Sequence, residues 1–165
     1  MTRIREEVEI EAPLETVWTV VHEDLKNAPR WTGNLERAEL LNDGPPGKGS
    51  EIRYHLKLPG GHRVQLDVLQ TTYNKPKRVA GHFTKGPLEG EWSYAYAERD
   101  GVTRLIYEMD YQLGGMMRFV GGAFRNAYAA GIRDNMRSLK RYIESGKMPR
   151  TTARTKTKAR RAALS

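Results

Sequence analysis

The stretch that decides the fold is residues 116–144, MMRFVGGAFRNAYAAGIRDNMRSLKRYIE, which follows a series of strand-like segments. Its apolar residues recur in steps of three and four, which is the spacing of one face of an α-helix. The stripe consists of Met117, Val120, Phe124, Tyr128, Ile132, Met136, Leu139 and Ile143. At 1.5 Å per residue such a helix is roughly 40 Å long. Because an amphipathic helix has to bury its apolar face, we expect this one to pack on the sheet that precedes it.

Segments that alternate apolar and polar residues come before the helix, as in half-buried strands. The first covers residues 3–11, and Pro13 then begins a short helix with Leu14, Val17, Trp18 and Val21 on one face. A second short helix is expected over residues 24–31. Further strands are predicted at residues 36–42, 51–58, 63–68, 78–84, 88–98 and 103–113. Short links favour antiparallel neighbours. The predicted fold class is α+β: a curved antiparallel sheet of about seven strands, wrapped around the long C-terminal helix, with two short helices after the first strand.

Glycines interrupt the long helical pattern at residues 121–122 and 131. A glycine inside a helix costs on the order of 1 kcal/mol relative to alanine. Two explanations remain open for the pair at 121–122. Either the glycines allow close packing or a static kink, or they form a hinge at the start of the helix.

The net charge of +8 is concentrated at the C-terminus of the 165-residue chain. Residues 147–165 hold seven lysines and arginines and no acid, which leaves about +1 for residues 1–146. We therefore expect a single domain at 1–146 and a disordered basic tail at 147–165. Such a tail suits weak contact with nucleic acid or an anionic membrane through counterion release, although it has no aromatic residue for base stacking.

The sequence contains no apolar run of eighteen residues, so no transmembrane segment is predicted. Its N-terminus lacks the apolar core of a secretory signal. There are no cysteines, which excludes disulfides and thiolate chemistry. A cytoplasmic location is expected from these features.

The candidate site is an aromatic and apolar face shared by the strands and the helix. Trp92, Tyr94 and Tyr96 alternate along one strand, and Tyr107, Met109 and Tyr111 alternate along the next. We expect a mostly apolar cavity, with a few phenol groups, between the sheet and the C-terminal helix. Its predicted lining is Tyr54, Leu56, Leu66, Val68, Phe83, Trp92, Tyr94, Tyr107, Met109, Tyr111, Met117, Val120, Phe124 and Tyr128. Each of these side chains is also compatible with simple packing in the core.

No catalytic constellation is recognisable. The four histidines lack metal-ligand spacing, and His55 and His82 fall on polar strand faces, where solvation is expected. Nucleophile-elbow, phosphate-loop and dinucleotide motifs are absent. Glu108 and Asp110 lie on the face opposite Tyr107. Accordingly, we assign no catalytic residue and expect neither a metal nor a cofactor.

The order of elements and several motifs resemble the START-like, helix-grip superfamily (SRPBCC). The residues that carry the resemblance are VEIEAPLETVW at 8–18, Trp31, Gly86-Pro87, Trp92-Ser93-Tyr94, the turn at 101–103 and the terminal helix with Asn135-Met136. Within the superfamily, the chain looks most like the bacterial polyketide cyclase/dehydrase and lipid-transport proteins. That resemblance implies a cavity for a hydrophobic ligand between sheet and helix. Cyclase members carry polar or basic groups at inward positions that here correspond to Leu66, Val68, Gln70 or Thr72.

Three functions remain open from the sequence. The favoured one is binding or transport of a hydrophobic small molecule, such as a lipid, a polyketide or an isoprenoid. The second is an aromatase/cyclase or dehydratase that acts on a polyketide, with Tyr94, Tyr107 or Tyr111 as a weak acid. The third is an RNA- or membrane-interacting protein that uses its basic tail.

Overall fold

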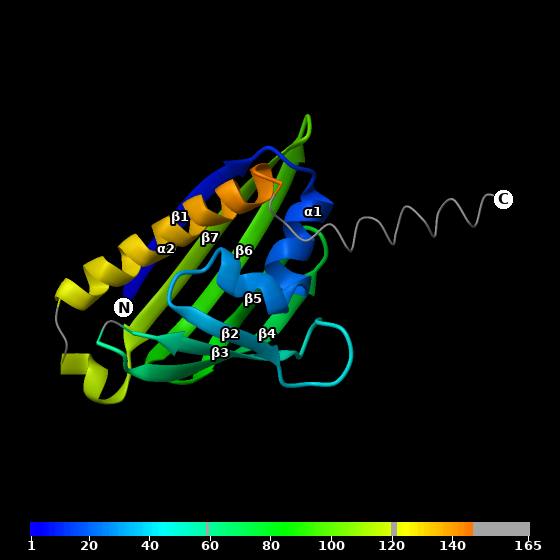
Figure 1. Cartoon of the computed structure of the whole chain (residues 1–165). Coiled ribbons are helices and arrows are strands. Elements are labelled where there is room, and N and C mark those ends of the chain that lie inside the picture. The colour runs from blue at the N-terminus through cyan, green and yellow to red at the C-terminus, as the bar shows by residue number, and fades with distance from the viewer. Residues whose placement is uncertain (59, 120–121, 147–165) are drawn as a thin grey trace.

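The computed structural model describes residues 1–58, 60–119 and 122–146, although not the side chains of residues 116–117 and 122–124 (Figure 1). Seven strands make up one sheet: β1 (Thr2–Ile10), β2 (Leu35–Leu40), β3 (Glu51–Lys57), β4 (Arg63–Asn74), β5 (Arg78–Lys85), β6 (Leu88–Arg99) and β7 (Val102–Leu113). The helical elements are α1 (Leu14–Trp18), a π-helical turn η1 (Thr19–Glu23), the 3-10 helices η2 (Leu25–Arg30) and η3 (Gly115–Phe119), and α2 (Gly122–Glu144).

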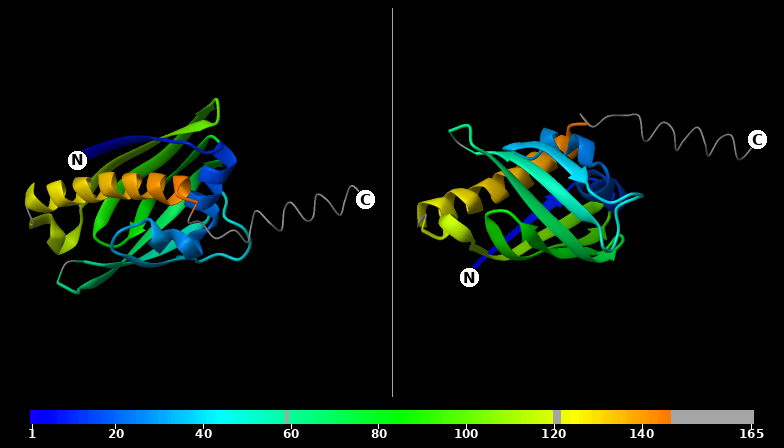
Figure 2. Two further views of the ribbon diagram at one scale, coloured as in Figure 1. Left: turned by 45° about the horizontal axis from the view of Figure 1, so that its top comes forward. Right: turned by 90° about the horizontal axis from the view of Figure 1, so that it is seen from below.

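The strands follow the order β1-β7-β6-β5-β4-β3-β2, and every neighbouring pair is antiparallel. Six strands form a meander, while β1 crosses over to pair with the last strand, so β1 and β2 become the two edges. The sheet curls, and α2 lies across its concave face (Figure 2). The predicted α+β fold, with a curved seven-stranded sheet, two short helical segments after β1 and a long C-terminal helix, is confirmed.

Polar contacts hold α2 along the β1 edge. The Arg133 guanidinium pairs with the Glu6 carboxylate at 3.3 Å, and the Lys140 ammonium donates to the carbonyl of Glu9 at 2.7 Å. Near the end of the helix, the Glu144 carboxylate accepts from the backbone N–H of Glu11 at 3.0 Å. On the other side of the helix, the Asn135 amide oxygen accepts from the backbone N–H of Gly33 at 2.9 Å. These contacts anchor α2 at both the β1 edge and the segment that leads into β2.

The C-terminal half of α2 is the closely packed half. Met136, Leu139 and Ile143 are 5%, 0% and 5% exposed and belong to the main hydrophobic core. Tyr128 and Ile132, in the preceding turns, are only partly buried against that core. Packing between helix and sheet therefore loosens towards the N-terminal end of α2.

The prediction of one helix from residue 116 is wrong. Residues 115–119 form the separate helical turn η3, and α2 begins at Gly122. This turn has 3-10 geometry; Gly115 at its start has a φ of +57°, and Phe119 at its end is 87% exposed. Apolar spacing alone does not distinguish a 3-10 turn from an α-helical turn. Gly122 of the proposed kink or hinge is the first residue of α2, whereas residue 121 and the tail at 147–165 lie outside the described residues.

Gly81 is a glycine on which the packing of the sheet depends directly. A Cβ atom at this position would lie 2.0 Å from the Leu69 carbonyl oxygen and 2.9 Å from the Trp92 ring. In contrast, a Cβ atom at Gly131, within α2, would have no neighbouring atom within 4 Å.

We predict opposite effects for alanine at these two glycines. Gly81→Ala should lower the free energy of unfolding by about 2 kcal/mol or more, because a backbone atom has to move. Gly131→Ala should raise it by up to about 1 kcal/mol, because alanine favours the helix. Urea denaturation of both variants measures the difference. Equal effects of the same sign would contradict the described packing.

Candidate functional site

The aromatic face of β6 and β7 lies on the core side of the sheet, as predicted. Tyr94 pairs with Tyr107 and Trp92 pairs with Met109 across the two strands. Trp92, Tyr107 and Met109 are 7%, 7% and 1% exposed. The rings of Tyr94 and Tyr107 are 4.7 Å apart between centroids. Antiparallel register thus places four large side chains together on the concave face.

A cluster of four tyrosines joins the sheet to the helix, and we call it the phenol cluster: Tyr54 of β3, Tyr94 of β6, Tyr107 of β7 and Tyr128 of α2. Burial raises the pKa of Tyr54 to about 12 and raises the pKa of the other three hydroxyls further. Interaction among the four hydroxyls contributes to the increases at Tyr94, Tyr107 and Tyr128. All four phenols are therefore neutral near pH 7 and able to donate or accept hydrogen bonds.

Several polar groups of this interior lack a protein partner. The Tyr107 hydroxyl donates to the Met109 sulfur at 3.3 Å. No hydrogen bond joins the hydroxyl of Tyr54 or Tyr94 to another described residue, and both side chains are only partly buried. Buried polar atoms without a partner in the described part of the chain include Trp92 Nε1, Gln70 Oε1 and the Tyr111 hydroxyl. Such groups are usually satisfied by protein, water or ligand, so their number here calls for an explanation.

The structure brings eleven of the fourteen predicted lining residues to the main core. The buried ones are Leu66, Val68, Trp92, Tyr107, Met109 and Tyr111, and the partly buried ones packed against them are Tyr54, Leu56, Phe83, Tyr94 and Tyr128. Val120 and the side chains of Met117 and Phe124 lie outside the described residues. These eleven residues come from five strands and α2, and their side chains form one contiguous wall of the core.

His22 is a buried residue that the sequence analysis did not single out. It lies on η1, is 4% exposed, and its Nε2 is 2.6 Å from the Tyr96 hydroxyl. Its ring packs 4.7 Å from Trp18 and 5.1 Å from Tyr94 between centroids. Burial lowers the pKa of His22 to about 3, so the imidazole is neutral. The four-residue spacing from Trp18, on the buried face of the helix, is the signal that could have found it.

His55 lies on the polar face of β3 and is partly exposed. Its ring is 20% exposed and its Nε2 lies 3.0 Å from the Glu39 carboxylate, in a surface cluster with Arg37. Arg37 points outward with a side chain that is 65% exposed. Within the described ranges, no group of three or more histidine and acidic side chains is placed to hold a metal ion.

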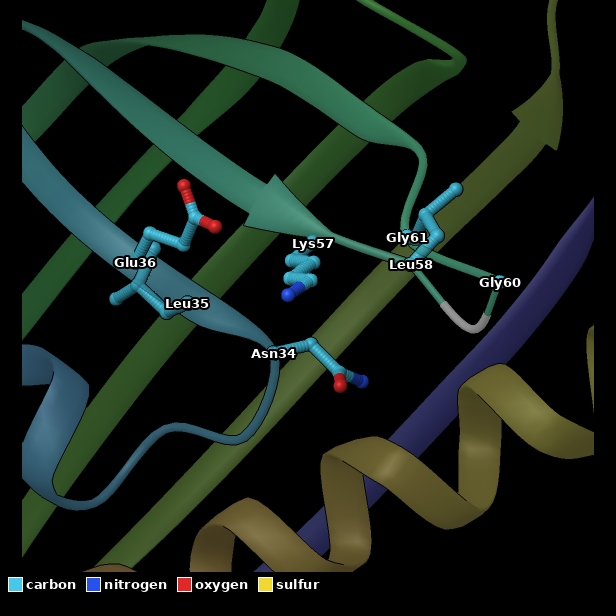
Figure 3. Close-up of a pocket in the computed structure, with 7 residues that line it drawn as sticks. All are labelled: Asn34, Leu35, Glu36, Lys57, Leu58, Gly60 and Gly61. Atoms are coloured by element: carbon cyan, nitrogen blue, oxygen red, sulfur yellow. The ribbon is translucent and has the colours of Figure 1, made fainter.

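A pocket of about 380 Å³ opens at the rim of the sheet (Figure 3). It lies between the start of β2 and the turn that joins β3 to β4, and it is lined by Asn34, Leu35, Glu36, Lys57, Leu58, Gly60 and Gly61. None of these residues was among the predicted lining. The pocket borders the interior through Leu35, which belongs to a small buried cluster with Ala28 and Ala38; Tyr54 and Leu56 pack against this cluster.

A curled sheet that holds one long helix over an aromatic interior defines the helix-grip class of α+β proteins. The chain belongs to the family described as polyketide cyclase/dehydrase and lipid transport, whose model matches residues 1–144. No curated protein sequence matches it significantly.

Solved structures share the fold at low sequence identity. A START superfamily protein from Mycobacterium smegmatis is 17% identical, with a TM-score of 0.69 over 87% of this chain and 97% of that one. The ginseng major latex-like protein 151 from Panax ginseng is 11% identical, with a TM-score of 0.66 over 86% and 96%. The di-domain ARO/CYC BexL from the BE-7585A biosynthetic pathway is 16% identical, with a TM-score of 0.68 over 90% and 48%. These likenesses support the fold. No described helix has the length and apolar character needed to cross a membrane.

We predict that His22 makes the protein sensitive to acid. Its folded pKa is about 3, below the ordinary value of 6.5, so the unfolded chain takes up the proton first as the pH falls. The contribution of neutral His22 to the free energy of unfolding is complete above pH 6.5 and is lost progressively between pH 6.5 and pH 3. Between pH 7 and pH 4 the free energy of unfolding should fall in both proteins. The fall should be about 3 kcal/mol smaller in His22→Gln than in the wild type.

Urea denaturation at pH 7, 5.5 and 4 provides the measurement. His62→Gln is the matched control, because His62 is exposed and should follow the wild-type profile. If His22→Gln shows the same pH dependence as the wild type, His22 is not a buried neutral imidazole.

Proposed function

We propose that this protein binds a hydrophobic small molecule in a space between the concave face of the sheet and α2. The observation that carries the proposal is the state of Tyr54 and Tyr94. Their hydroxyls are desolvated enough for the pKa to rise, and neither has a partner among the described residues. Because both side chains keep some accessible surface, a ligand or trapped water can reach these hydroxyls and is their expected hydrogen-bond partner.

The exposure of these side chains supports an internal space. Tyr54, Tyr94 and Tyr128 are each partly exposed, although burial raises the pKa of all three. A side chain that is surrounded by protein and still has accessible surface faces a space inside the molecule. The looser packing of the N-terminal half of α2 supports the same location, because Tyr128 belongs to that half.

The lining favours a large apolar ligand that carries a few oxygen atoms. Leu56, Leu66, Val68 and Phe83 supply apolar surface, while the phenol cluster supplies neutral donors and acceptors. Neutral groups orient hydroxyl, carbonyl or ether oxygens without selecting a charge. Lipids, polyketides and isoprenoid-like molecules have this combination.

Binding fits the described groups better than catalysis. Raising the pKa of the phenols moves them further from the range in which general acids operate near neutral pH. Asp67 is the only buried acid among the described residues, and Arg53 holds it by two hydrogen bonds of 2.9 Å and lowers its pKa. Leu66 and Val68 supply no proton-transfer group. A cyclase or dehydratase activity remains the alternative, and the similarity to a di-domain ARO/CYC protein is its support.

The basic tail carries a separate hypothesis. Contact of residues 147–165 with nucleic acid or an anionic membrane stays a prediction from charge, because those residues lie outside the described part of the chain. A partner whose binding disappears when residues 147–165 are deleted, while binding of apolar ligands is retained, would assign that role to the tail.

We predict that the wild-type protein binds the neutral fluorescent probe N-phenyl-1-naphthylamine, and that apolar alcohols displace it. Among these alcohols, Tyr94→Phe should weaken binding of long-chain diols, which carry a second oxygen for the phenol cluster, by about tenfold, the effect of roughly one hydrogen bond, while binding of the apolar probe changes little. Fluorescence titration measures both affinities.

Tyr142→Phe is the matched control. Tyr142 lies in the closely packed half of α2 and also has a buried hydroxyl without a described partner, so its loss should not affect either ligand. The proposal is contradicted if the wild type binds no probe, or if the two phenylalanine variants behave alike.

A further inference from the structure

The floor of the interior contains a row of three residues on three neighbouring strands. Gln70 of β4 pairs with Gly81 of β5, and Gly81 pairs with Trp92 of β6. Paired residues in antiparallel strands point to the same face of the sheet, so the three positions share a face. β4, β5 and β6 are consecutive in the sheet, as Figure 1 shows.

Glycine at the middle of this row leaves its two neighbours without a side chain between them. Two strand spacings separate Gln70 from Trp92, which is roughly 10 Å between their Cα atoms. The Trp92 ring leans over Gly81, since a Cβ atom there would lie 2.9 Å from Trp92 Cζ2. The indole edge and the Gln70 amide are thus the polar groups that flank the bare backbone of Gly81.

Both flanking groups are deeply buried and unsatisfied. Gln70 is 1% exposed and Trp92 is 7% exposed. Gln70 Oε1 is an acceptor without a donor, and Trp92 Nε1 is a donor without an acceptor, among the described residues. Leaving both unpaired costs on the order of 1–3 kcal/mol for each group, which is a large penalty at one small spot in the core.

A hydroxyl, of a ligand or of water, satisfies both atoms together. Its proton is donated to Gln70 Oε1 while its oxygen accepts the proton of Trp92 Nε1. A carbonyl or ether oxygen satisfies only the indole, and a hydrocarbon satisfies neither. The row therefore has the donor and acceptor pattern of a hydroxyl-recognition subsite. Because the two atoms have almost no accessible surface in this structure, the surrounding side chains have to move aside to admit the hydroxyl.

We propose that Gln70 and Trp92, on either side of Gly81, bind a hydroxyl group of the ligand. This inference rests on the proposed function and narrows it: the ligand is an apolar molecule whose buried part carries an alcohol or a phenol. The Tyr54 and Tyr94 hydroxyls are then left for further oxygens elsewhere along the molecule. A resident water would supply the same donor and acceptor pattern, so the test has to separate water from ligand hydroxyl.

The test uses three probes that differ at a single end: 1-dodecanol, dodecyl methyl ether and dodecane. Each probe is titrated against the full-length protein by displacement of N-phenyl-1-naphthylamine. The wild type should bind the alcohol about tenfold more tightly than the ether, because the ether lacks the proton for Gln70. Gln70→Met, which keeps the side-chain length and removes the amide, should abolish that preference and leave dodecane binding unchanged.

Gln65→Met is the matched control, since Gln65 is an exposed glutamine on the same strand and should keep the wild-type preference. Trp92→Phe is the second variant; it removes the indole donor and should weaken the alcohol and the ether together. The empty Gln70→Met protein should unfold at the same or a higher urea concentration than the wild type, because it loses an unpaired buried amide.

The outcomes separate the two proposals. The hydroxyl subsite is overturned if the alcohol and the ether bind equally tightly to the wild type and Gln70→Met changes neither affinity. This holds whether a resident water or nothing lies between Gln70 and Trp92. Binding of the apolar molecules as a class then still supports the proposed function. If none of the three probes nor N-phenyl-1-naphthylamine binds the wild type, the proposed function itself fails and the subsite fails with it.

Discussion

The burial of one face of α2 against a concave sheet is the constraint on which the rest of the structure depends. No other helix of comparable length is present in the described chain, so the sheet has to curl to cover the apolar side of α2. Met136, Leu139 and Ile143 meet that requirement at the C-terminal end of the helix, where packing is complete. Towards Tyr128 the same helix is only partly buried, and there the sheet presents phenols, an indole and an amide rather than a closed aliphatic core.

Much of the fold could be predicted from the sequence because its apolar residues follow two regular periodicities, one of strands and one of helices. The period of two placed Tyr94 and Tyr107 on the same face, and the spacing of three and four identified the helix that covers them. The start of that helix was placed too early, because apolar spacing does not distinguish the 3-10 turn of residues 115–119 from an α-helical turn. His22 was missed because a lone histidine on a short helix carries no signal apart from its distance from Trp18.

The details of the candidate site depend on register, which alternation alone does not determine. Irregularities between Asp67 and Val68, and between Gln70 and Thr72, shift which residues of β4 and β5 stand opposite each other. The row Gln70–Gly81–Trp92 appears only when that register is known. Alternation along a strand does not predict the rim pocket either, because its lining combines the ends of β2 and β3 with residues of the neighbouring turns. The polar groups of the interior share one property, which is that they are uncharged. Its phenols, indole and amide are suited to orienting an uncharged oxygen and poorly suited to transferring protons.

A high-resolution crystal structure of the protein as purified from its host tests this account most directly. We predict continuous electron density for an elongated apolar molecule between the sheet and α2, with oxygen atoms within hydrogen-bond distance of the Tyr54 and Tyr94 hydroxyls. A closed interior, in which side chains fill that space and both hydroxyls bond to protein groups, would contradict it.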